Sequence, residues 1–372
     1  MAKSAKSETK SSPALPAKSW DFLKKYIDNA SPVGFESSGQ KLWLEYLTPF
    51  VDSYFTDPYG TAVGVVNPEA PFKVVIEAHA DEISWFVNYI TPEGLLYLKR
   101  NGGVDHQIAP AQRVFIHGKK GKVPAVFGWP AIHTRLGNPD AKEPQPKVDS
   151  LFLDCGARNK KEVEELGVHI GAVVTYQDGY AELGYDYLIG RAFDNRVGGF
   201  MIAEVARLIK ENKKKLPYGL YVVNAVQEEV GLRGAEMIAR RIRPNIAVIT
   251  DVTHDTSTPM INKMIEGDIV CGKGPSLAYG PAVHNKLLSL VQETAEKNKL
   301  PVQMRAVSRS TGTDTDSFAY ANDGCPSVLI SIPLRYMHTT VEMLHKKDIE
   351  QTIQLMYETL LTLTPKTNLS YF

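Results

Sequence analysis

Residues 222–231 read V-V-N-A-V-Q-E-E-V-G, an apolar, β-branched run that ends in two adjacent carboxylates, Glu228 and Glu229. Such a run is typical of a strand, in which successive side chains point to opposite faces. Where the strand opens into a loop, however, both glutamates can reach one cavity. Two like charges buried together are costly unless a divalent cation lies beside them, so we ask whether the chain supplies further metal ligands.

The composition is that of an ordinary globular protein. The chain has 372 residues, 43% of them hydrophobic, with 42 basic and 42 acidic side chains, so nothing predicts a nucleic-acid or membrane partner. The three cysteines are far apart and form no C-x-x-C, which favours a reducing compartment. Residues 1–18 lack the apolar core of a signal peptide, so we expect a disordered tail and a cytoplasmic protein. An organelle transit peptide is the less favoured alternative, because the tail contains no arginine.

The pattern of strands and helices changes twice along the chain. Two helical segments precede apolar strands at residues 61–66 and 72–79. From about residue 91, Gly, Pro and short alternating strands take over, which is typical of a small barrel or sandwich. From residue 187, strands alternate with helices again, as in a sheet that is covered on both faces.

These patterns predict an α/β fold with a mixed central sheet, helices on both of its faces, and an inserted small β-barrel-like domain. We expect residues 19–90 and 187–372 to form one catalytic domain. Residues 91–186 would form the inserted β-rich domain.

Acidic or imidazole side chains follow an apolar run at five places in the chain. The segments are A-H-A-D-E at 78–82, F-D-N-R at 193–196, Q-E-E at 227–229, I-T-D at 249–251 and R-Y-M-H at 335–338. Ligands of open α/β sheets bind at the carboxyl ends of the strands, so these residues would meet at one rim. Imidazole and carboxylate without thiolate suit zinc, cobalt or manganese.

The count of charges favours two metal ions. If Asp194, Glu229 and Asp251 are ligands, two divalent cations and a bridging hydroxide make the centre neutral. Two ions about 3.5–4 Å apart form the usual clamp for amide or phosphate hydrolysis. Glu228 would then take a proton from the bridging water and pass it to the leaving amine. Asp81, two positions after His79 on a strand, faces the same side and can fix the tautomer of its imidazole.

Taken together, these motifs resemble the tetrahedral (TET) aminopeptidases, metallopeptidase family forty-two. The similarity runs from about Phe22 to Leu363 and includes V-I-T-D-V-T-H at 248–254 and G-G-V-D-H-Q-I-A-P-A-Q-R-V at 102–114. Thr311-Gly-Thr-Asp314 is similar to a loop near the substrate in that family, but here it continues with Thr315-Asp316 where Ala is expected after Asp314.

The resemblance implies a role for each matching residue. His79, Asp194 and Asp251 would hold one metal ion, and Asp194, Glu229 and His338 the other, with Asp194 bridging the two. Glu228 would be the general base, with Asp81 as the orienting carboxylate. The resemblance also implies that the inserted domain mediates dimers and hollow tetrahedral dodecamers.

The function predicted is a binuclear metal-dependent aminopeptidase that releases N-terminal residues from short peptides. It would use two divalent ions per subunit, Zn²⁺ or Co²⁺, and a bridging hydroxide whose attack is assisted by Glu228. A deacylase or carboxypeptidase with the same centre is the alternative, and a scaffold without catalysis is a third, against which Glu228 argues. We expect four other histidines to be structural or solvent-facing: His106, His133, His254 and His345.

Overall fold

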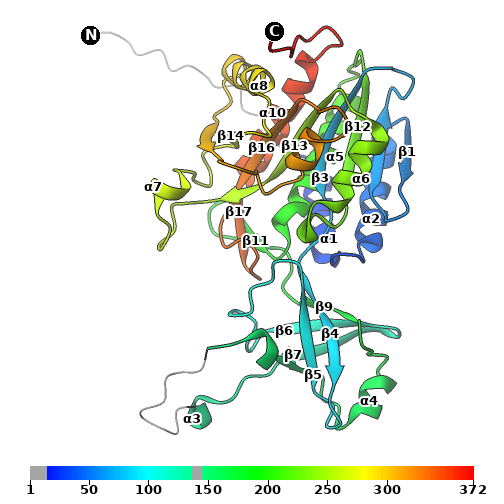
Figure 1. Ribbon diagram of the computed structural model, residues 1–372, viewed down its shortest axis with the longest axis vertical. Coiled ribbons are helices and arrows are strands. Elements are labelled where there is room, and N and C mark those ends of the chain that lie inside the picture. Colours follow the sequence, from blue (N-terminus) through cyan, green and yellow to red (C-terminus); the bar gives the residue numbers. More distant parts are fainter. Residues whose placement is uncertain (1–14, 136–144) are drawn as a thin grey trace.

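The computed structural model describes residues 15–135 and 145–372 (Figure 1). Most of the tail expected at residues 1–18 lies outside the described part of the chain. The first helix, α1 (Ala17–Asp28), begins directly after Pro16, so the last two residues of the expected tail are helical. None of the described helices is both long and apolar enough to cross a membrane.

A sheet of eight strands forms the centre of the upper part of the molecule (Figure 1). Its strands, in spatial order, are β1 (Ser53–Thr56), β2 (Ala62–Val66), β12 (Gly219–Ala225), β3 (Lys73–His79), β13 (Ile246–His254), β16 (Ser327–Leu334), β14 (Ser276–Tyr279) and β15 (Gln303–Ala306). The middle four are parallel, whereas β2 and β14 join them antiparallel, so the sheet is mixed as predicted.

Helices cover both faces of this sheet, as predicted. One face is covered by α1, α2 (Ser37–Leu47), α5 (Phe193–Glu211), α8 (Asn285–Lys297) and α10 (Lys346–Thr362), and the other by α6 (Arg233–Ile242) and α9 (Thr315–Ala319). The central helix α5 lies directly on β3 because Gly198 has no side chain: a Cβ there would lie 2.8 Å from the Cβ of Ala78. Burial of β-branched residues on both faces explains why the central strands are continuously apolar.

Six strands form a closed barrel below the sheet (Figure 1). In order around the barrel they are β4 (Ser84–Ile90), β5 (Leu96–Asn101), β8 (Phe152–Asp154), β7 (Gly121–Phe127), β6 (Arg113–Gly118) and β9 (Val173–Tyr176). The barrel has its own core, in which Phe127 contacts both Trp85 and Tyr176. It begins at Ser84, seven residues before the expected boundary at residue 91. A role in dimerisation stays a prediction.

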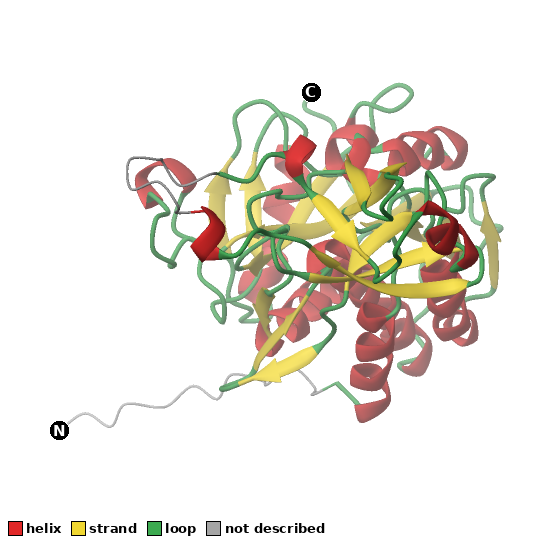
Figure 2. Cartoon of the chain, turned by 90° about the horizontal axis from the view of Figure 1, so that it is seen from below, coloured by secondary structure: helices red, strands yellow, loops and turns green. Residues whose placement is uncertain are grey.

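Shorter elements complete the described chain. They are α3 (Ile132–Arg135), α4 (Lys160–Glu165), α7 (Lys263–Glu266), three 3-10 turns, η1 (Thr48–Phe50), η2 (Val148–Ser150) and η3 (Glu228–Val230), and a small sheet of β10 (Ala181–Leu183), β11 (Tyr187–Gly190) and β17 (Glu342–His345). Seen from below, the barrel lies in front of the sheet and its helices (Figure 2). Because β3 leads into β4 within five residues, the carboxyl ends of the parallel strands face the barrel.

Trp43 provides a test of the packing between α2 and α5. Its indole is fully buried and donates a hydrogen bond of 2.7 Å to the carbonyl of Gly199. Replacing it with phenylalanine removes this hydrogen bond and part of a fully buried ring, so we expect Trp43→Phe to lower the free energy of unfolding by about 1–3 kcal/mol. Urea unfolding measures the loss. Trp20→Phe, at a partly buried position on α1, is the matched control, and equal losses in the two variants would contradict the assignment.

Candidate metal centre

The ends of neighbouring strands bring most of the predicted site residues together. His79 is the last residue of β3 and lies in register with Ala225, the last residue of β12. Asp251 lies in β13, the strand on the other side of β3. Glu228 and Glu229 occupy the turn η3, which follows β12 directly. The carboxyl ends of three adjacent parallel strands therefore supply four of the predicted residues.

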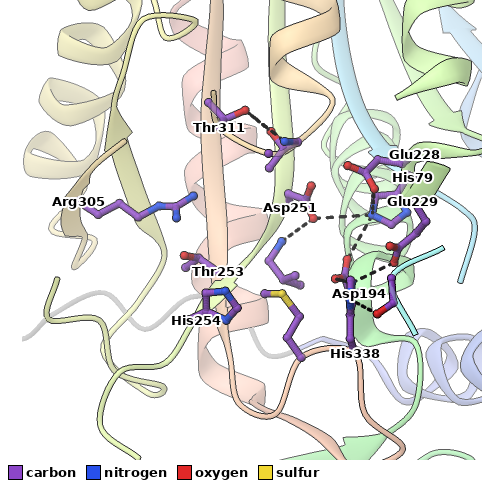
Figure 3. Close-up of a pocket in the computed structure, with 15 residues that line it drawn as sticks. His79, Asp194, Glu228, Glu229, Asp251, Thr253, His254, Arg305, Thr311 and His338 are labelled. Carbon is purple, nitrogen blue, oxygen red and sulfur yellow. Dashed lines mark hydrogen bonds and ion pairs between the residues drawn. The ribbon is translucent and has the colours of Figure 1, made fainter. Parts of the chain in front are cut away.

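Asp194 and His338 lie at the same rim of the sheet, in segments of irregular backbone. Asp194 stands at the start of α5 with a non-helical ψ of 112°, and its peptide bond to Asn195 is cis. His338 lies between β16 and β17 in a left-handed conformation, with φ of 62°. The structure thus places all the predicted residues in one neighbourhood, and Figure 3 shows the side chains of His79, Asp194, Glu228, Glu229, Asp251 and His338 gathered at one end of a cavity.

Asp194 lies between two groups of possible ligand atoms. Its Oδ1 is 3.2 Å from Nε2 of His79, and its Oδ2 is 3.2 Å from Nε2 of His338. Asp251 completes the first group, with Oδ1 3.9 Å from Nε2 of His79, and Glu229 the second, with Oε1 3.3 Å from Nε2 of His338. In each group the ligand atoms all lie within 4.8 Å of one another. One carboxylate therefore offers a separate oxygen to each group.

Asp81 orients three of the site residues at once. Its carboxylate is fully buried, and its Oδ1 lies 3.3 Å from Nδ1 of His79, which leaves Nε2 of that imidazole facing the site. The backbone N–H groups of Glu228 and Glu229 donate to its two oxygens, each at 3.1 Å. The expected contact with His79 is present, and the contacts with the turn η3 add to it.

Glu342, which the sequence did not single out, holds the other side of the site in the same manner. It is buried at the start of β17 and accepts a hydrogen bond from the backbone N–H of Asp194 at 3.1 Å and from that of His338 at 2.9 Å. In the sequence, Glu342 is marked only by its position four residues after the predicted ligand His338. Its two acceptor bonds fix the backbone of two residues that belong to the same ligand group.

Gly103, in the loop that follows the barrel strand β5, contacts His338 of the site. Its carbonyl oxygen lies 3.2 Å from Nδ1 of His338, so the imidazole presents Nε2 to Asp194 and Glu229. A Cβ at this position would lie 2.9 Å from the same nitrogen, which explains why a glycine is needed here. The loop after β5 therefore restricts the orientation of a side chain in the catalytic domain.

The carboxylates of the site repel one another. Burial raises the pKa of Glu228 to about 10, and the nearby Asp251 and Glu229 add to the shift. Burial likewise raises the pKa of Asp251 to about 7 and also raises that of Glu229. For His79, burial opposes the charge, but the surrounding carboxylates outweigh it and raise the pKa of the imidazole. So many buried carboxylates require added positive charge, and imidazole with carboxylate oxygen is a donor set that fits a divalent cation.

A second carboxyl pair lies behind His79 and was also not predicted. Glu77 of β3 and Asp314 are both buried, and burial raises the pKa of Glu77 to about 8. Burial also raises the pKa of Asp314, with Glu77 as the next cause. Each of the two carboxyl groups therefore makes a negative charge on the other more costly.

The cavity beside the ligand groups has a volume of about 430 Å³. Away from the ligands it is lined by Thr253, His254, Arg305, Thr311, Thr313 and Met337. His254, expected to be structural or solvent-facing, is exposed and also borders the cavity. Arg305 was not predicted at all. Thr311 and Thr313 belong to the loop for which a position near the substrate was implied, whereas Thr253 lies in β13.

A buried pair of ligand groups at the rim of a mixed α/β sheet, with a spare glutamate and an adjoining cavity, defines a metal-dependent hydrolase. The family model described as M42 glutamyl aminopeptidase matches residues 60–355, and the chain belongs to this family. It is accordingly an aminopeptidase that depends on a divalent metal.

Relatives and solved structures agree with this assignment. The chain is 31% identical to the lysyl aminopeptidase of Pyrococcus furiosus over 93% of its own length and 98% of the relative's. It is similar to the solved TET aminopeptidase of a marine-sediment Thaumarchaeota archaeon, with 30% identity, a TM-score of 0.89 and coverage of 94% and 97% of the two chains. The TET1 peptidase of Pyrococcus horikoshii, described as assembling into a tetrahedron or a large octahedral shell, matches with 26% identity, a TM-score of 0.82 and coverage of 93% and 100%.

The contact between Gly103 and His338 can be tested directly. In Gly103→Ala the new methyl group pushes against the imidazole, so we expect the affinity for divalent cations to fall about 10- to 100-fold, as for other residues that orient a ligand. Competition with a chromogenic chelator measures the affinity. The melting temperature of the metal-free variant serves as the control for folding, and an unchanged affinity in a folded variant would show that the contact does not orient His338.

Proposed function

We propose that the enzyme binds two divalent cations, Zn²⁺ or Co²⁺, and uses them to release the N-terminal residue of short peptides. His79, Asp194 and Asp251 would hold one cation, and Asp194, Glu229 and His338 the other. The observation that carries this proposal is the position of Asp194, whose two oxygens face two different imidazoles at the same distance of 3.2 Å. A carboxylate placed in this way is suited to bridge a pair of ions.

Glu228 is the residue that moves the proton. Bound cations would polarise the scissile carbonyl and lower the pKa of the attacking water. The carboxylate of Glu228 lies 3.7 Å from Nε2 of His79, at the edge of both ligand groups, and its backbone is fixed by Asp81. It accepts the proton of the attacking water and passes it to the nitrogen of the leaving amine.

The cavity explains how the enzyme acts at the end of a peptide. The free α-amino group lies beside the ligand groups, and the first side chain enters the cavity lined by Thr253, Arg305 and Thr311. A peptide with a blocked amino group cannot make the first contact, so an aminopeptidase differs here from a deacylase or carboxypeptidase with the same centre.

We further propose that the enzyme self-associates through the barrel and acts in the cytoplasm. The support is the assembly of the Pyrococcus horikoshii TET1 peptidase into closed shells, together with the similarity of fold over nearly the whole chain. Light scattering of the purified protein tests the assembly, and a monomer at all concentrations would refute it.

Removal of the metal should abolish peptide hydrolysis. We expect chelator-treated enzyme to be inactive, to regain activity with Zn²⁺ or Co²⁺, and to melt at a lower temperature, because ions that bind only the folded state stabilise it. Metal analysis of the reconstituted enzyme should give two ions per subunit, and His338→Ala should give one, because only the group around Glu229 loses a ligand. Full activity in chelator would refute the proposal, and N-acetylated peptides are the control for end specificity.

Glu228→Gln separates catalysis from metal binding. The amide has nearly the same shape but cannot take up the proton, so we expect turnover to fall about 10²- to 10⁴-fold. Metal content should stay at the wild-type value, because Glu228 is not a proposed ligand. Glu229→Gln is the matched control at the next residue and should lose metal. Equal turnover in Glu228→Gln and the wild type would show that another group moves the proton.

A further inference from the structure

Arg305 projects into the cavity from the side opposite the ligand groups (Figure 3). It lies in β15 at the edge of the sheet, in register with Ala278 of β14. The close-up shows its guanidinium directed towards Asp251 and the centre of the cavity. A long cationic side chain thus reaches the space where the first side chain of a substrate would lie.

The guanidinium has no partner of its own. Its Nε is buried and forms no hydrogen bond, and within residues 15–135 and 145–372 it forms no ion pair. Burial lowers the pKa of Arg305, and the negative charge of Asp251 partly offsets this shift. A buried N–H donor without an acceptor is costly, because its lost hydration is not compensated. The missing acceptor is the first reason to expect an anionic ligand.

The other groups at this end of the cavity do not supply that acceptor. Within the described residues, neither Thr311, Thr313 nor His254 forms a hydrogen bond with Arg305, and the hydroxyl groups of the two threonines bond to each other at 2.8 Å. The carboxylates that line the cavity all belong to the two ligand groups or to Glu228 beside them. Arg305 therefore gives this end of the cavity a fixed positive charge.

We propose that Arg305 makes the enzyme selective for an acidic N-terminal residue, glutamate or aspartate, whose carboxylate pairs with the guanidinium. The inference rests on the proposed function, because it takes the cavity to hold the first side chain of the peptide. Arginine pairs with a carboxylate through two parallel N–H bonds, which gives geometric selectivity as well as charge. A lysine or arginine side chain in the same place would meet a like charge and would be excluded.

The family assignment does not decide this point. The family model is described by glutamyl specificity, whereas the similar enzyme from Pyrococcus furiosus is a lysyl aminopeptidase. The two substrates carry opposite charges, so the preference depends on residues of the individual chain. Arg305 is such a residue.

The main alternative is that Arg305 binds the free carboxylate at the other end of a dipeptide. Aminoacyl 4-nitroanilides distinguish the two roles, because they have no C-terminal carboxylate. Glutamyl and glutaminyl nitroanilides have nearly the same shape and differ in one charge. The ratio of their kcat/KM values therefore measures only the effect of the charge on the first side chain, and no C-terminal carboxylate contributes to it.

We expect the metal-loaded wild type to favour glutamyl over glutaminyl nitroanilide about 10- to 100-fold, the range for a hydrogen bond to a charged group. Arg305→Met should bring the ratio close to one while leucyl nitroanilide is still cleaved. Arg305→Lys keeps the charge without the planar fork and should retain part of the preference. Arg158→Met, which removes an exposed arginine before the barrel helix α4, is the matched control and should leave the ratio unchanged.

Each other outcome overturns the inference. A glutamyl-to-glutaminyl ratio of kcat/KM near one in the wild type would show that Arg305 does not select the first side chain. An unchanged ratio in Arg305→Met would show the same. An effect of Arg305→Met that appears with dipeptides and not with nitroanilides would assign Arg305 to the C-terminal carboxylate.

A binding measurement separates this inference from the proposed function. Free L-glutamate should raise the melting temperature of the metal-loaded wild type more than L-glutamine does, and Arg305→Met should remove the difference. Absence of any nitroanilide cleavage by the loaded wild type would refute the proposed function, yet the melting measurement would still test Arg305. Cleavage of leucyl nitroanilide with no effect of Arg305 would leave the proposed function intact and refute the inference.

Discussion

Mutual repulsion among buried carboxylates is the constraint on which this structure depends. Asp194, Glu228, Glu229 and Asp251 all border one cavity, and burial makes the charge on most of them more costly. Removing one partner from such a cluster leaves an uncompensated charge, whereas added cations turn repulsion into attraction. The cluster is thus stable only in a fold that holds the ligands rigidly and supplies positive charge. Binding of a divalent metal and stability of the folded site are therefore expected to be thermodynamically coupled.

Two buried carboxylates outside the ligand set hold the ligands in position. Asp81 accepts hydrogen bonds from the backbone of Glu228 and Glu229, and Glu342 from the backbone of Asp194 and His338. Each bond fixes main chain where it departs from helix or strand, and His338 has a positive φ. Backbone strain at functional sites persists when the surroundings determine it fully. Asp81 and Glu342 therefore contribute to the site by fixing the backbone of the residues that line it.

The sequence predicted the parts of the site that depend on strand ends. His79, Asp251 and the pair Glu228–Glu229 follow apolar strands, so their meeting at one rim was predictable from parallel topology. Glu342 was not, because a bond to backbone N–H leaves no pattern in side-chain types. Arg305 was not predicted, because it lies in a short edge strand, Q-M-R-A. The residues of this strand alternate between partly buried and exposed, as in an ordinary surface strand. The barrel was expected to begin at residue 91 because β4 follows β3 so closely that its apolar residues were counted with the catalytic domain.

The rigid connection between barrel and sheet explains how a carbonyl of the barrel can orient a side chain of the catalytic domain. Asn101 of β5 donates to the carbonyl of Val33 at 2.9 Å and to Ser84 at 2.8 Å. Glu82, between β3 and β4, accepts from the backbone of Ser31 and contacts Arg191. These buried polar contacts are specific in geometry, and such contacts restrict position more than they add stability. Gly103, two residues after Asn101, is therefore held in place on the far side of His338. An insertion that moved independently could not keep a carbonyl 3.2 Å from that imidazole, so the barrel is part of the site as well as a separate unit of folding.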